Sequence, residues 1–441
     1  MVQPPADRGV APTRLWGGSL AWAILTVAVV VAGVLAVTVR PLAPDLGPLP
    51  DPARWFPRAV LERVAAYRGP VRIANVVGVV VDIAVPLLVV LTPPGRRLVA
   101  RIVVGVGRQR PVLAATAVIV TVIAMSAVAR LPLAVWAYTH ARRFGLSTQT
   151  PAGWAGDWAI ELAIFVVSSA VVAAAGYGLL SRWPRRWLLL VAPSALVAVA
   201  VATLAMPLVV EPLRFDVTEL PAGPAREALT PVLSAADQPT TPVLVADASR
   251  RTTRQNAYVA GVAGTRRIVL YDTLLERPPS QVALIVAHEL SHERNRDLAR
   301  GIVAGAAGLW LLAVVVDLVL RWRVARGRQP HVADPHAAGV VVVVVVVAMV
   351  VTTPLASWAS RRAEAAADLG ALRLSGATAV HCAVQLGLVE RNLSDPAPPT
   401  WERLWWWTHP PAVSRLELAS RIDASRAAAA AECRREPGDS P

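Results

Sequence analysis

The sequence predicts a mainly α-helical, polytopic membrane protein with about seven spans and a small β-sheet outside them. Three observations predict this class. Of the 441 residues, 55% are hydrophobic; the mean hydropathy is +0.50; and the apolar residues gather in long runs. Soluble domains have an apolar share nearer ~45–50%, so the runs decide the class before length does.

Seven stretches meet the requirement of ~20 predominantly apolar residues for a spanning helix. The first is longer than the apolar core of a signal peptide and lacks a convincing cleavage site, so we expect a span there. The last contains eight consecutive valines, Val340 to Val347, which should be helical because lipid offers the backbone no other hydrogen-bond partner. The stretches are 18–39, 73–92, 112–138, 157–180, 187–210, 302–320 and 337–358.

Two segments outside the spans are mixed in polarity. In 211–300, the sequence predicts short strands at 241–246, 256–261 and 266–271, the last two forming a hairpin, and then a helix from about Pro279 through Asp297. The segment 359–423 is predicted to be helical to Glu390 and again after Pro411. The predicted division is an N-terminal membrane region of five spans (1–210), two parts of one domain (211–300 and 359–423), spans six and seven (301–358), and a disordered tail (424–441).

All 44 basic residues are arginine, and the net charge is +14. The arginines cluster beside apolar runs, which favours the positive-inside rule over nucleic-acid binding. Arginine-rich loops at 96–110, 182–186 and 321–328 are predicted to be cytoplasmic, with 211–300 on the other side of the cell membrane. Six arginines between Arg40 and Arg72 oppose this bias, so the side on which a site in 211–300 lies stays open.

The stretch VAHELSHERNRD, residues 286–297, carries the chemistry. On a helix, His288 and His292 project from one face, and two imidazoles at that spacing can bind one Zn²⁺. Glu289 lies about 100° round the helix, beside the metal, where it can deprotonate a water that the zinc activates. We therefore predict one zinc ion per chain, with Glu289 as the general base.

A catalytic zinc needs a third protein ligand and an open position. Glu293 and Asp297 are about 120–160° away from the histidine face and are not expected to reach the ion. Glu364 is the best candidate, and Asp368, four residues later, is expected to hydrogen-bond a ligating histidine. His409 is the alternative ligand, or else a donor to the developing oxyanion.

The remaining histidines and the tryptophan cluster are given minor roles. His381 is expected to be a surface or packing residue, and His140 an isolated loop residue. His331 and His336 fall in the loop on the far side of the membrane. Trp401 and Trp405 to Trp407 are expected to anchor at the bilayer interface rather than bind an apolar substrate.

Five stretches in order, NAYVAG, RRIVLYDTLLE, HELSHERNRD, EAAAD and THPPAVSRLE, resemble the membrane-embedded zinc metallopeptidases that include the type I CAAX prenyl protease and HtpX. The resemblance is specific over about 250–420. It implies a zincin-like metallopeptidase domain with Glu364 as third ligand, and contacts from Asn256 and His409 to the substrate or transition state. Ser291 departs from the small glycine usual in that family.

We therefore expect a zinc-dependent membrane endopeptidase that hydrolyses membrane-associated or unfolded peptides with metal-activated water. Its partners would be a peptide or protein substrate and the lipid bilayer, and no nucleic acid. The alternative is a non-catalytic, zinc-containing membrane scaffold or sensor, which a fourth protein ligand such as His409 would favour. A transporter is disfavoured, because Asp82, Asp157, Glu161 and Asp317 form no repeat-related pattern.

Overall fold

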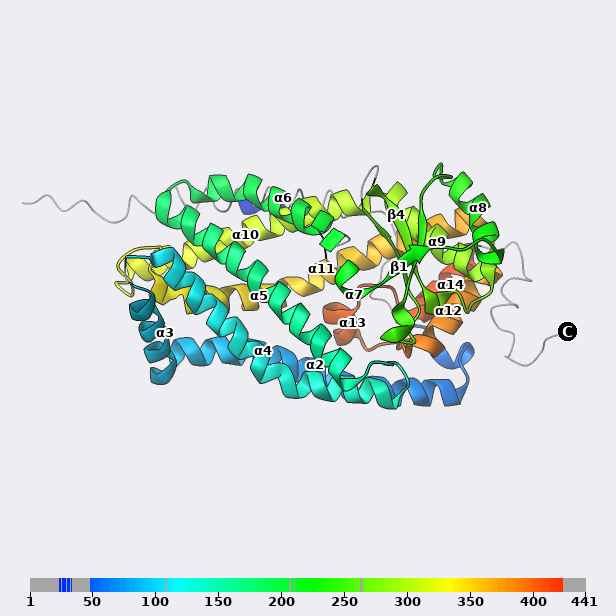
Figure 1. Ribbon diagram of the computed structural model, residues 1–441, viewed down its shortest axis with the longest axis horizontal. Helices are drawn as coiled ribbons and strands as arrows, with labels where there is room; N and C mark the ends of the chain where they lie inside the picture. The colour runs from blue at the N-terminus through cyan, green and yellow to red at the C-terminus, as the bar shows by residue number, and fades with distance from the viewer. Residues whose placement is uncertain are drawn as a thin grey trace, which may run out of the picture.

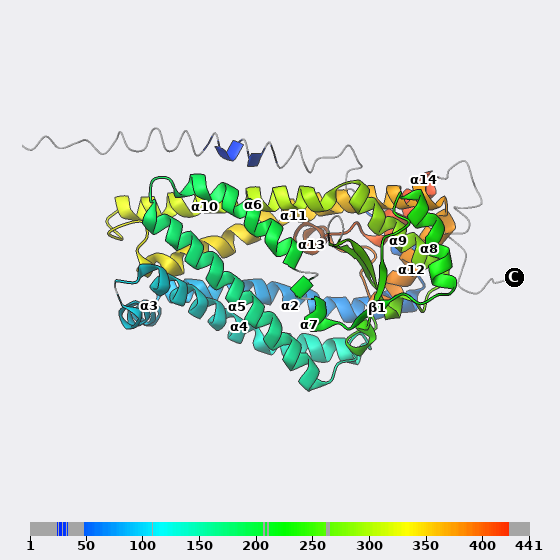
Figure 2. The same cartoon turned by 45° about the horizontal axis from the view of Figure 1, so that its top comes forward.

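Long helices run side by side along the long axis of the molecule, and a small sheet with shorter helices lies at one end (Figures 1 and 2). The computed structural model describes residues 48–107, 109–205, 208–209, 211–261 and 265–422, with a few residues between 24 and 33. Six helices of this part are long and apolar enough to cross a membrane. They are α2 (Arg58–Leu91), α4 (Pro111–Arg143), α5 (Pro151–Arg182), α6 (Trp187–Ala205), α10 (Asp297–Ala325) and α11 (Ala338–Ser375). The prediction of a polytopic helical membrane protein is confirmed.

These helices correspond to six of the seven predicted spans; the first, 18–39, lies almost entirely outside the described residues. Several helices extend well beyond their apolar runs. The longest, α11, has 38 residues, or about 57 Å at 1.5 Å per residue. It carries the valine run and Glu364 on one continuous helix. The span and a predicted metal ligand are therefore parts of a single element.

A sharp turn separates α2 from α3 (Pro93–Val106), which lies across the end of the long helices, opposite the sheet (Figure 1). Thr92 ends α2 and caps α3, since its hydroxyl accepts from the Gly95 amide at 3.2 Å. A Cβ on Gly95 would lie 2.4 Å from the Val89 carbonyl oxygen, so only glycine permits this turn. Most of the predicted loop at 96–110 is therefore helix, since Arg96, Arg97 and Arg101 lie in α3. Helix α3 and the arginine-rich loops after α5 and after α10 share this end of the molecule (Figures 1 and 2).

The sheet has four strands in the order β1-β2-β4-β3. The β2–β4 pair is parallel, and both outer pairs are antiparallel. The predicted hairpin is confirmed as β3–β4, with Ala257 opposite Leu270. The sequence did not predict β1, which has three residues and no alternating pattern. The strands are β1 (Val217–Glu219), β2 (Val243–Ala246), β3 (Ala257–Ala260) and β4 (Arg267–Tyr271).

Helices α8 (Pro224–Ala235) and α9 (Pro279–Arg294) pack against the sheet. Their shared core contains Leu229 and Val232 of α8, Ile268 of β4, and Val286 and Leu290 of α9, all at most 7% exposed. Because one face of α9 is buried in this core, the neighbouring face is left for His288 and Glu289. The apolar run VALIVA therefore anchors the helix that carries the predicted metal site.

The predicted helix through Asp297 is wrong at its C-terminal end. Helix α9 stops at Arg294, Arg296 adopts a left-handed conformation (φ 55°), and α10 begins at Asp297. His140 is also not a loop residue. It lies in α4, is buried, and its Nε2 donates a 3.0 Å hydrogen bond to the Tyr67 carbonyl.

The C-terminal part is helical to Asn392, breaks, and resumes after Pro411, as predicted. The structure adds a short helix, α13, which contains three of the four tryptophans of the cluster, Trp401, Trp405 and Trp406. The tail 424–441 lies outside the described residues. The remaining elements are η2 (Pro52–Arg54), α7 (Glu211–Arg214), η4 (Ala248–Arg250), η6 (Asp272–Leu274), η7 (Pro335–Ala337), α12 (Thr378–Asn392), α13 (Thr400–Trp406) and α14 (Ala412–Ile422).

Candidate metal centre and active site

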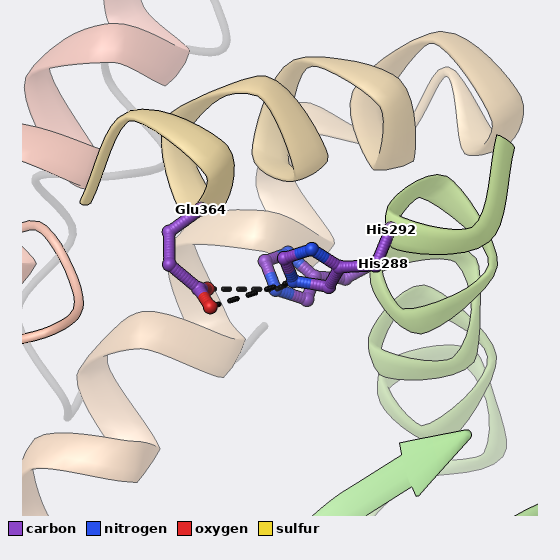
Figure 3. Close-up of side chains that lie close together, drawn as sticks. All are labelled: His288, His292 and Glu364. Atoms are coloured by element: carbon purple, nitrogen blue, oxygen red, sulfur yellow. Dashed lines mark hydrogen bonds and ion pairs between the residues drawn. The ribbon is translucent and has the colours of Figure 1, made fainter. Parts of the chain in front are cut away.

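His288, His292 and Glu364 converge on one point, two from α9 and one from α11 (Figure 3). The Nε2 atoms of the two histidines are 3.2 Å apart. The Glu364 carboxylate lies 3.1 Å from His288 Nε2 and 3.4 Å from His292 Nε2. These three side chains form the one group of candidate ligands within the described residues whose ligand atoms all lie within 4.8 Å of one another.

The far nitrogen of each histidine faces a carboxylate. His292 Nδ1 lies 2.9 Å from Asp297, and His288 Nδ1 lies 3.0 Å from Asp368. Such a partner fixes the tautomer, so that both Nε2 lone pairs face the shared point. Asp368 is the residue expected to support a histidine. Asp297 was not expected to reach the metal ion. Its carboxylate instead contacts His292 Nδ1, the ring nitrogen that faces away from the shared point.

Asp368 is itself held by Arg415 of α14, whose Nε donates to the carboxylate at 2.8 Å. Both side chains are nearly or fully buried. The pair links α14 to α11 behind the histidines. Sequence reasoning missed Arg415, although it lies in the THPPAVSRLE stretch; no spacing rule connects it with a residue forty-seven positions earlier.

The close approach of α9 and α11 depends on Gly370. A Cβ at this position would lie 2.5 Å from the Ser291 hydroxyl oxygen. Ser291 is 3% exposed, and its hydroxyl donates to the Ala287 carbonyl at 2.7 Å. Glycine in α11 therefore makes room for the serine that stands in the metal motif of α9. The departure at Ser291 is compatible with close packing of the two helices.

The three ligand atoms fit a tetrahedral metal ion. Zinc binds nitrogen and carboxylate oxygen at about 2.0–2.1 Å, and the edge of a tetrahedron with such bonds is about 3.3 Å. The two Nε2 atoms are 3.2 Å apart, and the two Glu364 oxygens lie 3.1 Å (Oε2 to His288) and 3.4 Å (Oε1 to His292) from them, all close to that value. His409 Nε2 lies 3.4 Å from Glu364 but does not belong to the compact group. Three protein ligands leave one position open, which disfavours the closed structural site of the scaffold alternative.

The two histidines hold protons strongly when no metal competes. Burial lowers the pKa of His288, but its contacts with Asp368 and Glu364 outweigh burial and raise it to about 9. Burial likewise opposes protonation of His292, but Asp297 and Glu364 raise its pKa to about 10. A metal ion must therefore displace two protons at neutral pH.

Glu289 lies beside this group on α9 and lines a cavity of about 500 Å³. Burial raises the pKa of its carboxyl group, although the two neighbouring histidines oppose the rise. A carboxylate with a raised pKa is a better proton acceptor near neutral pH than an exposed one. The other described carboxylates of the cavity, Asp368 and Asp395, are ion-paired with Arg415 and Arg72. Glu289 makes no ion pair within the described residues and is not a candidate ligand.

The same cavity brings in Asn256 and His409. Asn256 immediately precedes β3, the outer strand, and its side chain is exposed. Of the two alternatives predicted for His381, packing is correct: it is 2% exposed, borders the cavity, and burial lowers its pKa to about 4. Trp406 and Trp407 also line the cavity, whereas Trp401 and Trp405 are exposed.

The irregular segment that carries His409 is held from α11 and α2. Arg361, one turn before Glu364 and 1% exposed, donates to the carbonyls of Arg403 and Trp407, each at 2.6 Å. The Arg68 guanidinium lies 5.6 Å from the Trp407 ring centroid. From the sequence, Arg361 or Arg362 was considered only as an ion-pair partner of Glu364 on a solvated helix face; the bonds from Arg361 to these carbonyls were not predicted.

Comparisons with known proteins agree with this geometry. Residues 221–423 match peptidase family M48. The uncharacterized metalloprotease YhfN of Bacillus subtilis is 25% identical over 304 residues, which cover 66% of this chain and 70% of that protein. A CAAX prenyl protease 1 homolog of Oryza sativa subsp. japonica is 28% identical over 224 residues, which cover 50% of this chain and about half (52%) of that protein.

The fold has a counterpart in the crystal structure of S. mikatae Ste24p, with a TM-score of 0.70 and 19% identity over 93% of this chain and 99% of that one. Fold, site and relatives together define a metallopeptidase with multiple membrane spans. The match to peptidase family M48 spans residues 221–423, the region that contains all three candidate ligands. The resemblance stated from the sequence motifs is confirmed.

Proposed function

We propose that the protein is a zinc-dependent endopeptidase of the cell membrane, which cleaves membrane-associated or unfolded peptides. The observation that carries the proposal is the convergence of His288, His292 and Glu364, with Glu289 beside them in a cavity. A bound zinc ion would supply Lewis-acid chemistry, by acidifying water and polarising the scissile carbonyl. Zinc is proposed over other metals because the donor set is two imidazoles and one carboxylate with tetrahedral spacing.

The proton transfers fall to Glu289. Its carboxylate takes a proton from the attacking water and delivers it to the nitrogen of the leaving amine. His409 lies next to Glu364, where its imidazole can donate to the oxygen of the carbonyl as negative charge develops. The exposed amide of Asn256 lines the same cavity and is proposed to orient the peptide.

The substrate is proposed to add as a further strand beside β3. In the described part of the chain, β3 pairs with β4 on one side and with no strand on the other. Main-chain pairing along this edge positions a scissile bond without needing particular side chains. The end of β3 nearest the cavity is Asn256–Ala257, so an added strand would lead into the site.

Glu289→Gln in purified, zinc-loaded protein tests the mechanism. General-base catalysis contributes roughly 10²- to 10⁴-fold, so we expect at least about a hundredfold loss of kcat. Zinc content should not change, because Glu289 is not a ligand. Glu293→Gln is the matched control, since Glu293 lies on the same helix but pairs with Arg266. Full proteolysis by Glu289→Gln would refute the mechanism.

A further inference from the structure

Arg254 is a cation of the active-site cavity without a carboxylate partner. It is half-buried and lines the cavity. Its guanidinium donates to the Tyr67 hydroxyl at 2.8 Å and makes no ion pair within the part of the chain that the structure describes. A guanidinium carries five N–H donors, so one bond to a neutral hydroxyl leaves most of them for a ligand.

The other arginines of the cavity are already paired. Arg68 binds Glu402 at 2.7 Å, and Glu402 is fully buried. Arg415 binds Asp368, as described above. The cavity carboxylate of Asp395 is paired with Arg72. Arg254 is therefore the cavity arginine whose charge is not neutralised by another described residue.

The Arg254 side chain is held in place before any ligand arrives. Its guanidinium carbon lies 5.9 Å from the centroid of the Tyr67 ring, in addition to the hydrogen bond to the Tyr67 hydroxyl. Its backbone is fixed too, since its amide donates to Thr252 at 3.1 Å and its carbonyl accepts from Thr273 at 2.7 Å. A preorganised arginine loses less entropy when it binds an anion.

The position of Arg254 relies on the same backbone that presents Asn256. Asn392 of α12 binds both backbone groups of the residue between them: its Oδ1 accepts from the Gln255 amide at 3.0 Å, and its Nδ2 donates to the Gln255 carbonyl at 3.2 Å. Two residues span at most about 7 Å. Arg254 thus lies no more than about two substrate residues beyond Asn256, on the N-terminal side of β3.

We propose that Arg254 is a specificity-determining residue that binds a carboxylate of the peptide substrate. This inference rests on the proposed function. The planar fork of a guanidinium matches a carboxylate, with two parallel N–H···O bonds. A substrate strand antiparallel to β3 would place the residues that follow the cleaved bond towards Arg254. The carboxylate comes either from an Asp or Glu side chain there or from a free C-terminus.

The test uses the full chain, zinc-loaded, in bilayer nanodiscs, with fluorogenic peptides that differ only in charge. One series replaces Gln by Glu at each position around the cleaved bond; a second compares a free C-terminal acid with its amide. For each enzyme the readout is the ratio of kcat/KM for the acid peptide to that for its neutral twin. This ratio does not depend on the fraction of folded enzyme.

The wild-type ratio is expected to be roughly ten- to a hundredfold in one series, the range of a hydrogen bond to a charged group. Arg254→Gln should bring this acid-to-neutral ratio near one. Arg254→Glu should bring it below one, because the new carboxylate repels the carboxylate of the peptide. Arg391→Gln is the matched control, since Arg391 is exposed and pairs with Glu276 outside the cavity; it should keep the wild-type ratio.

The series that shows the preference identifies the source: a side chain in the first, a C-terminus in the second. A wild-type ratio near one in both series, or an unchanged ratio in Arg254→Gln, overturns the inference. Both outcomes leave the proposed function standing as long as neutral peptides are cleaved in a Glu289-dependent way. If no peptide is cleaved in that way, the proposed function fails, and the inference fails with it.

Discussion

Each histidine of the candidate metal site makes contacts through both of its ring nitrogens. The Nε2 atom of each histidine faces the shared point, and its Nδ1 atom faces a carboxylate, Asp368 or Asp297. The carboxylates thereby orient the rings and also raise their pKa values. Proton binding and metal binding therefore compete for the same two nitrogens.

This competition predicts a steep dependence of zinc affinity on pH. Both pKa values are raised, to about 9 and about 10, so each histidine of the metal-free protein is protonated below its pKa. Zinc then releases two protons, and its affinity should rise by about two log units per pH unit up to pH ~9 and level off above ~10. Competition with a zinc-buffering chelator measures the slope; a slope near zero would contradict the prediction.

Asp297 should affect metal retention without touching the metal. Removal of a carboxylate behind a ligating histidine typically costs 10- to 100-fold in metal affinity. We therefore expect Asp297→Ala to raise the dissociation constant for zinc by about that factor, as measured by equilibrium dialysis. Asp216→Ala is the control, because the Asp216 side chain is 82% exposed and pairs only weakly, at 3.6 Å, with Arg250. Equal zinc affinity in the two variants would show that Asp297 is not a support.

Residue spacing predicted the candidate ligands and the contact from Asp368, but it did not predict the contact from Asp297. The spacing of four within HELSH and within EAAAD fixes each pair on its own helix face, and that much is local. Asp297 was placed on the wrong face because the helix was extended through it, whereas the left-handed Arg296 breaks α9 and turns Asp297 back towards His292. Arg415 and Arg361 act across distances in sequence that no periodicity describes.

At the scale of elements, the site depends on how closely α9 and α11 approach. Gly370 and Ser291 form the contact, and a side chain at Gly370 has no room. Because α9 supplies two ligands and α11 the third, a change in helix separation acts directly on the geometry of the three ligand atoms. The glycine is thus a requirement of the metal site as well as of the packing.

Gly370→Ala should therefore weaken zinc binding, and Ser291→Gly should restore it. The added Cβ would lie 2.5 Å from the Ser291 hydroxyl oxygen, which forces the helices apart or the serine to move. Overpacking of this kind typically costs about 1–3 kcal/mol. Zinc affinity and thermal stability of both single variants and the double variant measure the effect.

The matched control for this pair is Gly308→Ala, in a helix where a Cβ would meet nothing within 4 Å. That variant should keep wild-type zinc affinity. A double variant no better than Gly370→Ala alone would show that Ser291 is not the residue that needs the space.

Hydropathy predicted the long helices well and their ends poorly. Apolar runs identify the part of a helix that can lie in lipid. Helices α2, α4 and α11 continue past their runs into polar sequence, where they pack in the clusters around the sheet, α9, α12 and α14. We call this end of the molecule the peptidase end. The same limit explains His140, which lies just beyond an apolar run but within α4. The three-residue β1 has too few residues for a pattern to be detected.

At the scale of the whole molecule, the arginine-rich loops and the peptidase end lie at opposite ends (Figures 1 and 2). The positive-inside rule predicts that the loop end is cytoplasmic and that the metal site faces away from the cytoplasm. The relatives match the peptidase region without deciding this point, so orientation stays a prediction.

Reporter fusions test the orientation. Alkaline phosphatase fused to the C-terminus should be active and green fluorescent protein at the same position dark, because both report the side of the peptidase end. Fusions that end after Arg328, in the loop between α10 and α11, should give the reverse pattern. Active phosphatase only at Arg328 would place the metal site in the cytoplasm.

One helix, α11, carries both the valine run of the predicted span and the carboxylate of Glu364, with Pro354 between them. Because this helix is about 57 Å long, a change of tilt at its membrane end, imposed by a thinner or thicker bilayer, is expected to displace the end that carries Glu364. That displacement would change the distances between a bound metal ion and its candidate ligands, of which two lie on α9 and one on α11. The surrounding lipid thus becomes a determinant of coordination chemistry, and hydrolysis rates compared across detergents or bilayers of unequal thickness report on that mechanical link.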